Sequence, residues 1–501
     1  MAQLFDSIRA RNAAANAGGR WTEIFLLLFA VVIVGVAAAV TMMSMEKSIT
    51  VDLIWLLAGY FGLFALAHAA VRMFAPYSDP YLLPCAALLN GIGLVIIYRL
   101  DLAAEAADPE ASFDVIRQLM WTLLGIVALI GTMIGMRDHR ALSKFGYTLG
   151  FFGLLLLMIP TILPSRFSEV NGAKNWILLP GFSIQPGEFS KILLIISMAA
   201  ILVSKRDLFA TAGKRFLGID LPRARDLGPV LLAWLLSLVV LVLNSDLGTS
   251  LLIFATVLTM IYTATEKVSW LLIGLVLFIA GATAAYFMFG HVRVRVQTWL
   301  DPFAYYDGTG YQLSQGMFGM ATGGVGGTGL GNGRPQQVPF ANTDFITSTI
   351  GEELGLIGLA AVLLVYLVFV YRAIRIALTV RDSFGKLLAT GLGFTIAVQL
   401  FVVVGGVSRL IPMTGLTMPF VAYGGSSLLA NYIILAILLR ISNEARTPLP
   451  PVNTPAPAAA AAVPAAPAPQ AAPAAPAGPA ASAGPAAPQA GSPGSGARWN
   501  G

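Results

Sequence analysis

The segment PFANTDFITSTIGEELG, residues 339–355, places three carboxylates at the start of a strongly apolar stretch: Asp344, Glu352 and Glu353. Ionisable side chains within or beside such a stretch are costly, and they are functional candidates by default. A carboxylate in this position could act as a general acid or base, or it could be a structural group that is paired with a basic partner.

Asp344 allows two interpretations. It follows Asn342 and Thr343 and immediately precedes the apolar residues, a position typical of a helix N-cap, and any of the three side chains could provide the cap. A carboxylate at the end of a long loop could equally meet a substrate and serve as a general base. These residues alone leave both interpretations open.

Glu352 and Glu353 lie two helical turns further into the apolar stretch, where a free carboxylate is expensive. Buried pairing with a basic neighbour such as Arg409 explains them better than a direct role in chemistry.

Two further polar sites border apolar stretches. In SIQPGEFSKILLI, Glu188 and Lys191 are spaced i and i+3 on one helix face, which predicts a local ion pair. In NSDLGTS, Asp246 stands between two apolar stretches, so a structural cap through Asp246 or Thr249 is favoured there.

The glycine run GGVGGTGLGNG, residues 323–333, has no Gly-Lys-Ser/Thr ending, so a phosphate-loop interpretation is very weak and close backbone turns are favoured. In HVRVRVQTWLDP, Arg293 and Arg295 could bind phosphate oxygens, or they could be interfacial arginines whose stems lie along apolar surface.

The composition indicates the class of protein to which these groups belong. Of 501 residues, 57% are apolar and 11% charged, against about 25% charged in soluble domains. The single cysteine, Cys85, excludes an intramolecular disulfide and a cysteine-based metal site. The histidines His68, His139 and His291 lack metal-ligand spacing and are interpreted as packing or loop residues. We therefore expect an all-α polytopic membrane protein.

The apolar stretches predict about twelve transmembrane helices. They are expected at residues 22–44, 52–75, 81–98, 115–136, 145–163, 188–204, 227–244, 247–265, 269–290, 346–370, 387–408 and 420–440. The first is too long for a signal-peptide core and is expected to be retained.

The distribution of Lys and Arg predicts the orientation. With a cytoplasmic N-terminus, the cytoplasmic segments carry twenty of these residues and the opposite loops eight. Both termini are then cytoplasmic, and the long loops 164–187 and 291–345 are extracellular. The net charge of +6 reflects this topology, not nucleic-acid binding. Residues 447–501, almost wholly Ala, Pro, Gly and Ser, predict a disordered cytoplasmic tail.

Six segments in order resemble the SEDS family, which includes RodA, FtsW and SpoVE. They are NGAKNWILLPGFSIQPGEFSK, NSDLGTS, RVRVQTWLDPFAYYDGTGYQLSQ, GGVGGTGLGNG, TDFITSTIGEELGLIG and IPMTGLTMPFVAYGGSSLL. The resemblance implies a ten-helix membrane core over residues 81–441, preceded here by a cytoplasmic segment, 1–21, and an extra transmembrane hairpin, 22–80.

The family resemblance also implies an activity: a peptidoglycan glycosyltransferase that polymerises lipid II at the outer face of the cytoplasmic membrane. Asp344 matches an aspartate that the family requires, Trp176 a functionally important tryptophan, and Glu188 with Lys191 a polar pair that lines a central cavity. Lys174 and Gln312 are further candidates for substrate binding. The chain departs from the usual family residues at Asn175, Asn342, Gly405, Ala422 and around Tyr305, Tyr306 and Asp307.

The resemblance assigns roles to the charged groups. Asp344 would take the proton from the 4-hydroxyl of the acceptor GlcNAc. Lys191, Arg293 or Arg295, or a divalent cation such as Mg²⁺ or Mn²⁺, would offset the charge of the undecaprenyl pyrophosphate that departs. No cofactor or metal site is otherwise indicated.

The sequence leaves several functional alternatives open. WLDPF, residues 299–303, and the short N-terminal segment favour cell elongation over a division role. The resemblance implies a class B penicillin-binding transpeptidase as partner, besides lipid II and membrane lipids. A lipid II flippase and a scaffold acting through the tail are the competing functions, and the clustering of polar residues at the predicted outer side disfavours the flippase.

Overall fold

The computed structural model describes residues 19–48, 51–108, 110, 113–170, 172–180, 182–205, 215–216, 219–220, 235 and 246–448. Within these residues, eleven helices are long and apolar enough to cross a membrane. They are α2 (Gly19–Ser44), α3 (Val51–Phe74), α4 (Leu82–Ala107), α5 (Asp114–Gly135), η1 (His139–Phe145) with α6 (Gly146–Ile162), α8 (Pro186–Ser204), α11 (Leu247–Thr265), α12 (Ser269–Met288), α15 (Ile346–Thr379), α16 (Ser383–Val407) and α17 (Gly425–Arg446).

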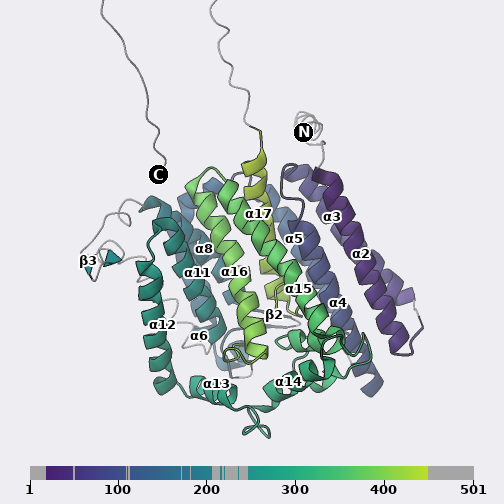
Figure 1. The fold of residues 1–501 in the computed structure, drawn as a ribbon. Coiled ribbons are helices and arrows are strands. Elements are labelled where there is room, and N and C mark those ends of the chain that lie inside the picture. The colour runs from purple at the N-terminus through teal and green to yellow at the C-terminus, as the bar shows by residue number, and fades with distance from the viewer. Residues whose placement is uncertain are drawn as a thin grey trace, which may run out of the picture. The chain divides into compact units, whose positions relative to one another are not determined.

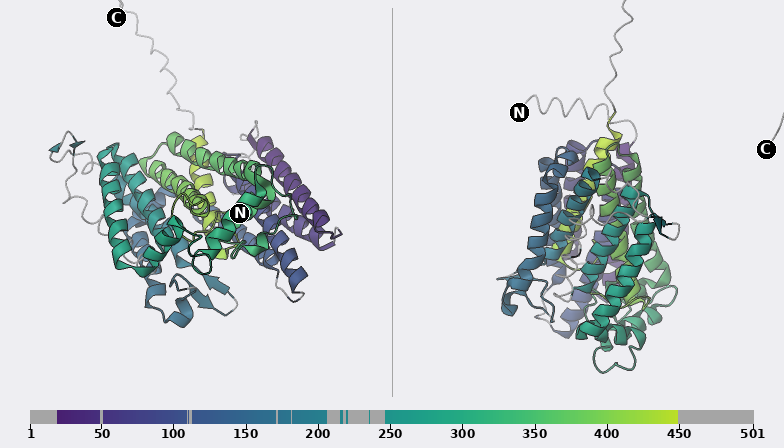
Figure 2. Two further views of the ribbon diagram at one scale, coloured as in Figure 1. Left: turned by 60° about the horizontal axis from the view of Figure 1, so that its bottom comes forward. Right: turned by 90° about the vertical axis from the view of Figure 1, so that its left-hand side faces the viewer.

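The helices run side by side as one bundle (Figures 1 and 2). α4 lies inside it, with 89% of its most apolar window buried, whereas α12 lies at a flank with only 6% buried. Outward-facing Leu, Ile, Val and Phe side chains on α2, α12 and α15 leave the bundle surface apolar, as a membrane-embedded surface requires. The chain is therefore a multi-pass membrane protein.

Eleven of the twelve predicted spans coincide with these helices, and the twelfth, residues 227–244, lies outside the described residues except for residue 235. The predicted loop 291–345 contains two helices, α13 (Gly290–Leu300) and α14 (Tyr311–Gly323), and the 3₁₀ turn η2 (Pro335–Gln337). Loop 164–187 contains α7 (Ser165–Ser168) and a hairpin of β1 (Ile177–Leu179) with β2 (Phe182–Ile184). A second short strand pair joins β3 (Arg215–Phe216) to β4 (Ile219–Asp220).

We call the end of the bundle that carries α13 and α14 the loop end; it is the lower end in Figure 1. The predicted N-terminal segment and Ala/Pro tail fall almost wholly outside the described residues. The domain boundaries assigned from the sequence stay predictions.

The long helix α15 is broken at Gly355, whose φ of 67° and ψ of −170° interrupt the helical hydrogen bonds. The glycine run, residues 323–333, lies against this break.

Four hydrogen bonds join the glycine run to the two sides of the break. The amides of Thr328 and Gly329 donate to the carbonyls of Glu352 and Glu353, at 2.9 and 3.0 Å. On the other side of the break, the amides of Leu356 and Ile357 donate to Gly324 and Val325, at 3.0 and 3.1 Å. The backbone groups freed by the break are therefore satisfied within the protein, as hydrocarbon surroundings demand.

The close contact between the glycine run and α15 requires glycine. Gly327 has a φ of +83°, and a Cβ there would collide with the carbonyl oxygen of Glu353. At Gly323, a Cβ would collide with the carbonyl of Gly351. The glycine run thus makes close turns against a broken helix, as the sequence favoured.

Two buried carboxylates hold the same loop from the side. Glu353 forms an ion pair with Arg99 of α4 and accepts from the amide of Gly331 at 2.7 Å. Glu352 accepts from the amide of Arg334 at 2.6 Å. Glu353 has the expected buried basic partner, but that partner is Arg99 and not Arg409, whereas Glu352 bonds to a backbone amide. The assignment of both glutamates to a purely structural role stays a prediction. Long-range pairing between α4 and α15 is invisible to sequence spacing, because 254 residues separate Arg99 from Glu353.

We predict that Gly327→Ala destabilises the protein and that Gly326→Ala does not. The first substitution forces a positive φ on alanine, at about 1–2 kcal/mol, and adds a backbone collision. The second meets nothing within 4 Å and has no positive φ. Thermal unfolding of both variants in detergent should show a lower Tm for Gly327→Ala alone. Equal Tm values would contradict the role assigned to the glycine run.

Candidate active site

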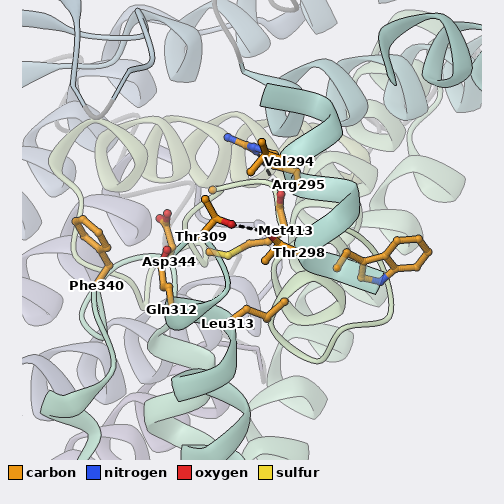
Figure 3. A pocket seen from close by; sticks show the side chains of 11 residues that line it. Val294, Arg295, Thr298, Thr309, Gln312, Leu313, Phe340, Asp344 and Met413 are labelled. Carbon is orange, nitrogen blue, oxygen red and sulfur yellow. Dashed lines mark hydrogen bonds between the residues drawn. The ribbon is translucent and has the colours of Figure 1, made fainter. Parts of the chain in front are cut away.

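A cavity of about 370 Å³ opens at the loop end. Its lining comes from α13, from the N-terminal turn of α14, from the residues just before α15, and from the segment that joins α16 to α17 (Figure 3). The lining residues are Val294, Arg295, Thr298, Trp299, Thr309, Gln312, Leu313, Phe340, Asp344, Met413 and Gly415. Among the predicted site residues, the structure brings Asp344, Arg295 and Gln312 together in this cavity.

Asp344 is held from both sides while its carboxylate stays available. Phe345, directly after it, is fully buried, and the ring sits where a Cβ on Gly316 of α14 would collide. Asn342, two residues before it, donates to Asp114 at 3.0 Å and accepts from the amide of Tyr423 at 2.8 Å. The backbone around Asp344 is therefore tied to α5, α14 and the segment before α17.

The capping interpretation of Asp344 is wrong. α15 begins at Ile346, after Phe345, and its first turn has no side-chain cap. The serine and threonine side chains of that turn bond elsewhere: Ser348 donates to the Gly316 carbonyl at 2.6 Å and Thr349 to the Ala341 carbonyl at 3.1 Å. The first turn of α15 is thus anchored by tertiary contacts, and the Asp344 carboxylate faces the cavity (Figure 3).

Burial raises the pKa of Asp344 to about 6, while the positive charge of Arg295 lowers it from the value that burial alone would give. A general base with a pKa close to the working pH combines the ionised form with useful basicity. Perturbed titration in a cleft is a recognised indicator of a functional site.

Arg295 is the basic group that faces this carboxylate. Its Nη1 donates to the carbonyl oxygens of Met413 and Thr414, at 3.3 and 2.9 Å, which fixes the guanidinium on the cavity wall. Arg293 is exposed and donates to the Phe287 carbonyl at 3.2 Å, and it does not line the cavity. Residues two apart on a helix are separated by about 200°, so these two candidate phosphate ligands point to different sides of α13.

α13 itself is fastened by a reciprocal contact. The Trp299 indole donates to the Arg409 carbonyl at 3.0 Å, and the Arg409 Nε donates back to the Trp299 carbonyl at 2.8 Å. Arg409 has a φ of 61°, uncommon for a residue with a side chain. It therefore binds the segment after α16 to α13 and helps to hold Arg295 over the cavity.

The predicted Glu188–Lys191 ion pair is present, buried, at 2.6 Å. Lys191 also donates to Gln399 of α16 at 3.0 Å, and Gln399 donates to the Thr417 carbonyl at 2.8 Å. Neither Glu188 nor Lys191 lines the cavity described above. Through Gln399, the pair is instead linked to the backbone of the segment that joins α16 to α17.

Asp246 caps α11, as predicted, by accepting from the Thr249 amide at 3.0 Å. Burial raises the pKa of Asp246, the Thr249 hydrogen bonds lower it, the charge of Glu188 raises it, and Arg295 lowers it. Arg295 is thus within electrostatic reach of two carboxylates, Asp246 and Asp344. Glu188 and Asp246 are like charges that repel each other, and Arg295 offsets the charge of Asp246 as well as that of Asp344.

Trp176 and Lys174 lie in loop 164–187, next to the β1–β2 hairpin, and they are not among the cavity-lining residues. The Trp176 amide donates to the Ser168 carbonyl at 3.3 Å. Their assignment to substrate binding stays a prediction.

Several lining residues were not identified from the sequence. Phe340 has a φ of 57° and a side chain that is 53% exposed at the cavity. Gly415, with a φ of 79°, lies so close that a Cβ there would be 3.5 Å from the Asp344 carboxylate. Thr298 and Thr309 hydrogen-bond each other at 3.3 Å across the cavity wall. Phe340 and Gly415 are marked only by a positive φ, which has no simple sequence signal beyond glycine. Nothing in the sequence distinguishes Thr298 and Thr309.

Known proteins are similar to this chain over most of its length. The family model of FtsW/RodA/SpoVE cell cycle proteins matches residues 80–447. A protein of Mycobacterium bovis named "Peptidoglycan glycosyltransferase RodA" is 55% identical over 430 residues, covering 86% of this chain and 92% of that protein. A Geobacter protein named "Probable peptidoglycan glycosyltransferase FtsW" is 32% identical over 373 residues, covering 74% and 97%.

One solved structure is similar in fold, with a TM-score of 0.59 and 25% sequence identity, covering 74% of this chain and 99% of that one. It is described as "Structural coordination of polymerization and crosslinking by a peptidoglycan synthase complex". The helices that carry the cavity all lie within the residues matched by the family model, whereas α2 and α3 precede them.

We predict that Asp344→Asn stabilises the protein at pH 8 and has little effect near pH 4. Because the folded-state pKa is raised, the native state is favoured while Asp344 is protonated, and this stability is lost as the pH rises through about 6. The gain for the uncharged asparagine is at most about 3 kcal/mol at pH 8. Thermal unfolding across this pH range measures it.

Asp301→Asn is the matched control, because Asp301 is exposed at the end of α13 and asparagine can keep its hydrogen bond to the Ala304 amide. A pH-independent difference between Asp344→Asn and wild type would show that the Asp344 carboxylate is well solvated.

Proposed function

This chain belongs to the FtsW/RodA/SpoVE family of cell cycle proteins, and from that premise we propose that it is a peptidoglycan glycosyltransferase that polymerises lipid II during cell elongation. Identity of 55% to relatives named RodA, against 32% to one named FtsW, supports the elongation role.

One observation carries the catalytic proposal: a carboxylate without a hydrogen-bond partner among the described residues, with a pKa raised to about 6, faces an open cavity. Asp344 takes the proton from the 4-hydroxyl of the acceptor GlcNAc. The hydroxyl oxygen then bonds to C1 of the donor MurNAc. The bond from C1 to the pyrophosphate oxygen breaks, and undecaprenyl pyrophosphate leaves with the electron pair.

Arg295 is the group that geometry favours for the leaving pyrophosphate. Of the three basic candidates, Lys191 is buried against Glu188 and Gln399, and Arg293 lies outside the cavity. The Arg295 guanidinium is fixed by two carbonyls and keeps further N–H donors for phosphate oxygens. A donor fixed in advance stabilises developing charge without reorganisation.

A divalent cation fits the cavity only if the substrate supplies most of its ligands. Asp344 is the one carboxylate among its lining residues, and Mg²⁺ is commonly bound by one or two carboxylates together with substrate phosphates. Asp344 would then hold a cation that neutralises pyrophosphate charge. Arg295 supplies a fixed positive charge in either case.

The membrane topology supports catalysis at the outer face of the cytoplasmic membrane. The excess of Lys and Arg predicts cytoplasmic termini, and the loop end with its cavity then faces outward, where wall polymer is assembled. A class B penicillin-binding transpeptidase is the expected partner, because the fold resembles that in a synthase complex that couples polymerization to crosslinking.

The deciding experiment is polymerisation of labelled lipid II by the purified protein, with and without its transpeptidase. We predict that Asp344→Asn lowers the rate about 10²- to 10⁴-fold, and that the wild-type rate rises with pH through an apparent pKa of about 6. Equal rates for wild type and mutant would remove the general-base role. If folded wild type makes no glycan under any partner or cation, a flippase or scaffold function takes precedence.

We further predict that Arg295→Gln slows polymerisation about 10²-fold or more, whereas Arg293→Gln changes it little. Both substitutions remove one positive charge from the same helix, so they affect the overall charge equally, but only Arg295 lines the cavity. Initial rates at matched folding, judged by size-exclusion chromatography, compare them. A similar loss in both variants would indicate general attraction of the anionic substrate instead of a specific contact.

A further inference from the structure

A second cluster of charged side chains gathers at the other end of α15 from Asp344, where η1, the start of α16 and the end of α17 meet. Its centre is His139, whose side chain is 1% exposed. The His139 Nδ1 lies 3.1 Å from the Glu444 Oε2 and 4.0 Å from the Asp138 Oδ1. One ligand atom from each of these three residues falls within 4.8 Å of the others.

The imidazole is oriented before any ligand arrives. Its Nε2 lies 2.8 Å from the Asp382 Oδ2, and its ring stacks on Phe384 with an interplanar angle of 10°. Gly385 leaves the space for this contact, because a Cβ there would collide with the His139 Nε2. A carboxylate on one ring nitrogen fixes the tautomer and directs the other nitrogen toward a metal, as in carboxylate–histidine–metal arrangements.

The other ring nitrogen has no hydrogen-bond partner. The His139 Nδ1 is a buried polar atom without such a bond among the described residues, although two carboxylates are close. Buried polar atoms are nearly always satisfied, and an unsatisfied one requires an explanation such as an ion. The nitrogen is aimed into the space between Glu444 and Asp138.

The charges also match a dication. Three carboxylates, on Asp138, Asp382 and Glu444, surround the imidazole, and one guanidinium, Arg140, pairs with the Glu444 Oε1 at 2.6 Å, so the carboxylates outnumber the guanidinium. Arg140 occupies the far oxygen of Glu444, so the Oε2 remains for a metal ion.

We propose that His139, Glu444 and Asp138 form a binding site for a divalent transition-metal ion of the Zn²⁺ class, with Asp382 positioning the histidine. One imidazole nitrogen and two carboxylate oxygens are a donor set that suits Zn²⁺, with water completing the tetrahedron. The ion ties η1 to the last turn of α17. The proposal is independent of the cavity and of glycosyl transfer.

The test uses the full chain, purified through a tag without histidines and treated with EDTA. Titration with Zn²⁺ against a chromophoric chelator should give one site per chain, together with a rise in Tm. Glu444→Gln should weaken binding at least tenfold, because the amide can keep the Arg140 contact but loses the anionic ligand. Asp138→Asn should also weaken binding; asparagine can keep the cap on the Arg140 amide.

Asp382→Asn distinguishes positioning from ligation and should weaken binding about 10- to 100-fold. Glu105→Gln is the matched control, since it removes an exposed carboxylate that pairs with Lys47 at the loop end and should leave binding unchanged. No saturable Zn²⁺ binding in wild type, or equal binding in wild type, Glu444→Gln and Asp138→Asn, would overturn the proposal. If one variant misfolds, the other decides, because Asp138 is half exposed.

Discussion

The cavity depends on one constraint, the break in α15 and the glycine run that fills it. A helix interrupted inside a membrane bundle leaves amides and carbonyls that lipid cannot satisfy. Here the backbone of residues 324–329 supplies both donors and acceptors, so the break is stabilised by a segment that must be almost free of side chains. The break therefore affects where the candidate base lies. The residues before the break, Ile346–Leu354, pack on α14 and so place Asp344, which directly precedes this part of α15.

Buried charge reinforces the same junction. Arg99 reaches from α4 to Glu353 and also donates to the carbonyl of Gly333 and to Gln336 at 2.8 Å. Ion pairs buried this deeply contribute little net stability compared with apolar packing, but they are strongly destabilising when one partner is lost. Their role here is to fix positions, because one guanidinium on α4 holds the glycine run, η2 and α15, which are all far from α4 in sequence. A rigid wall is what a site needs if its donors are to be aligned before substrate binds.

Much of the bundle and part of the site could be predicted from the sequence, because both depend on local signals. Long apolar runs define spans, and the i, i+3 spacing of Glu188 and Lys191 correctly gave an ion pair. The predictions that were wrong concern contacts between residues far apart in sequence, or the direction in which the backbone points a side chain. Arg409 was assigned to the wrong partner because its true contacts, the carbonyls of Trp299 and Leu300, carry no charge and no fixed spacing. Arg293 and Arg295 looked equivalent until the helical backbone of α13 separated them.

The same helix explains why Arg295 lines the cavity and Arg293 does not. α13 lies across the loop end, pinned at Trp299, so only one of its faces can meet the cavity. Arg295 falls on that face and shares its charge between Asp246 and Asp344. In the proposed reaction Asp344 gains a proton, and Arg295 then loses one of its two negative neighbours at the stage when pyrophosphate charge develops. On this proposal, proton uptake by Asp344 and stabilisation of the leaving group are coupled through a single guanidinium. Lys191 could not provide this coupling, because it is paired with Glu188 and does not line the cavity.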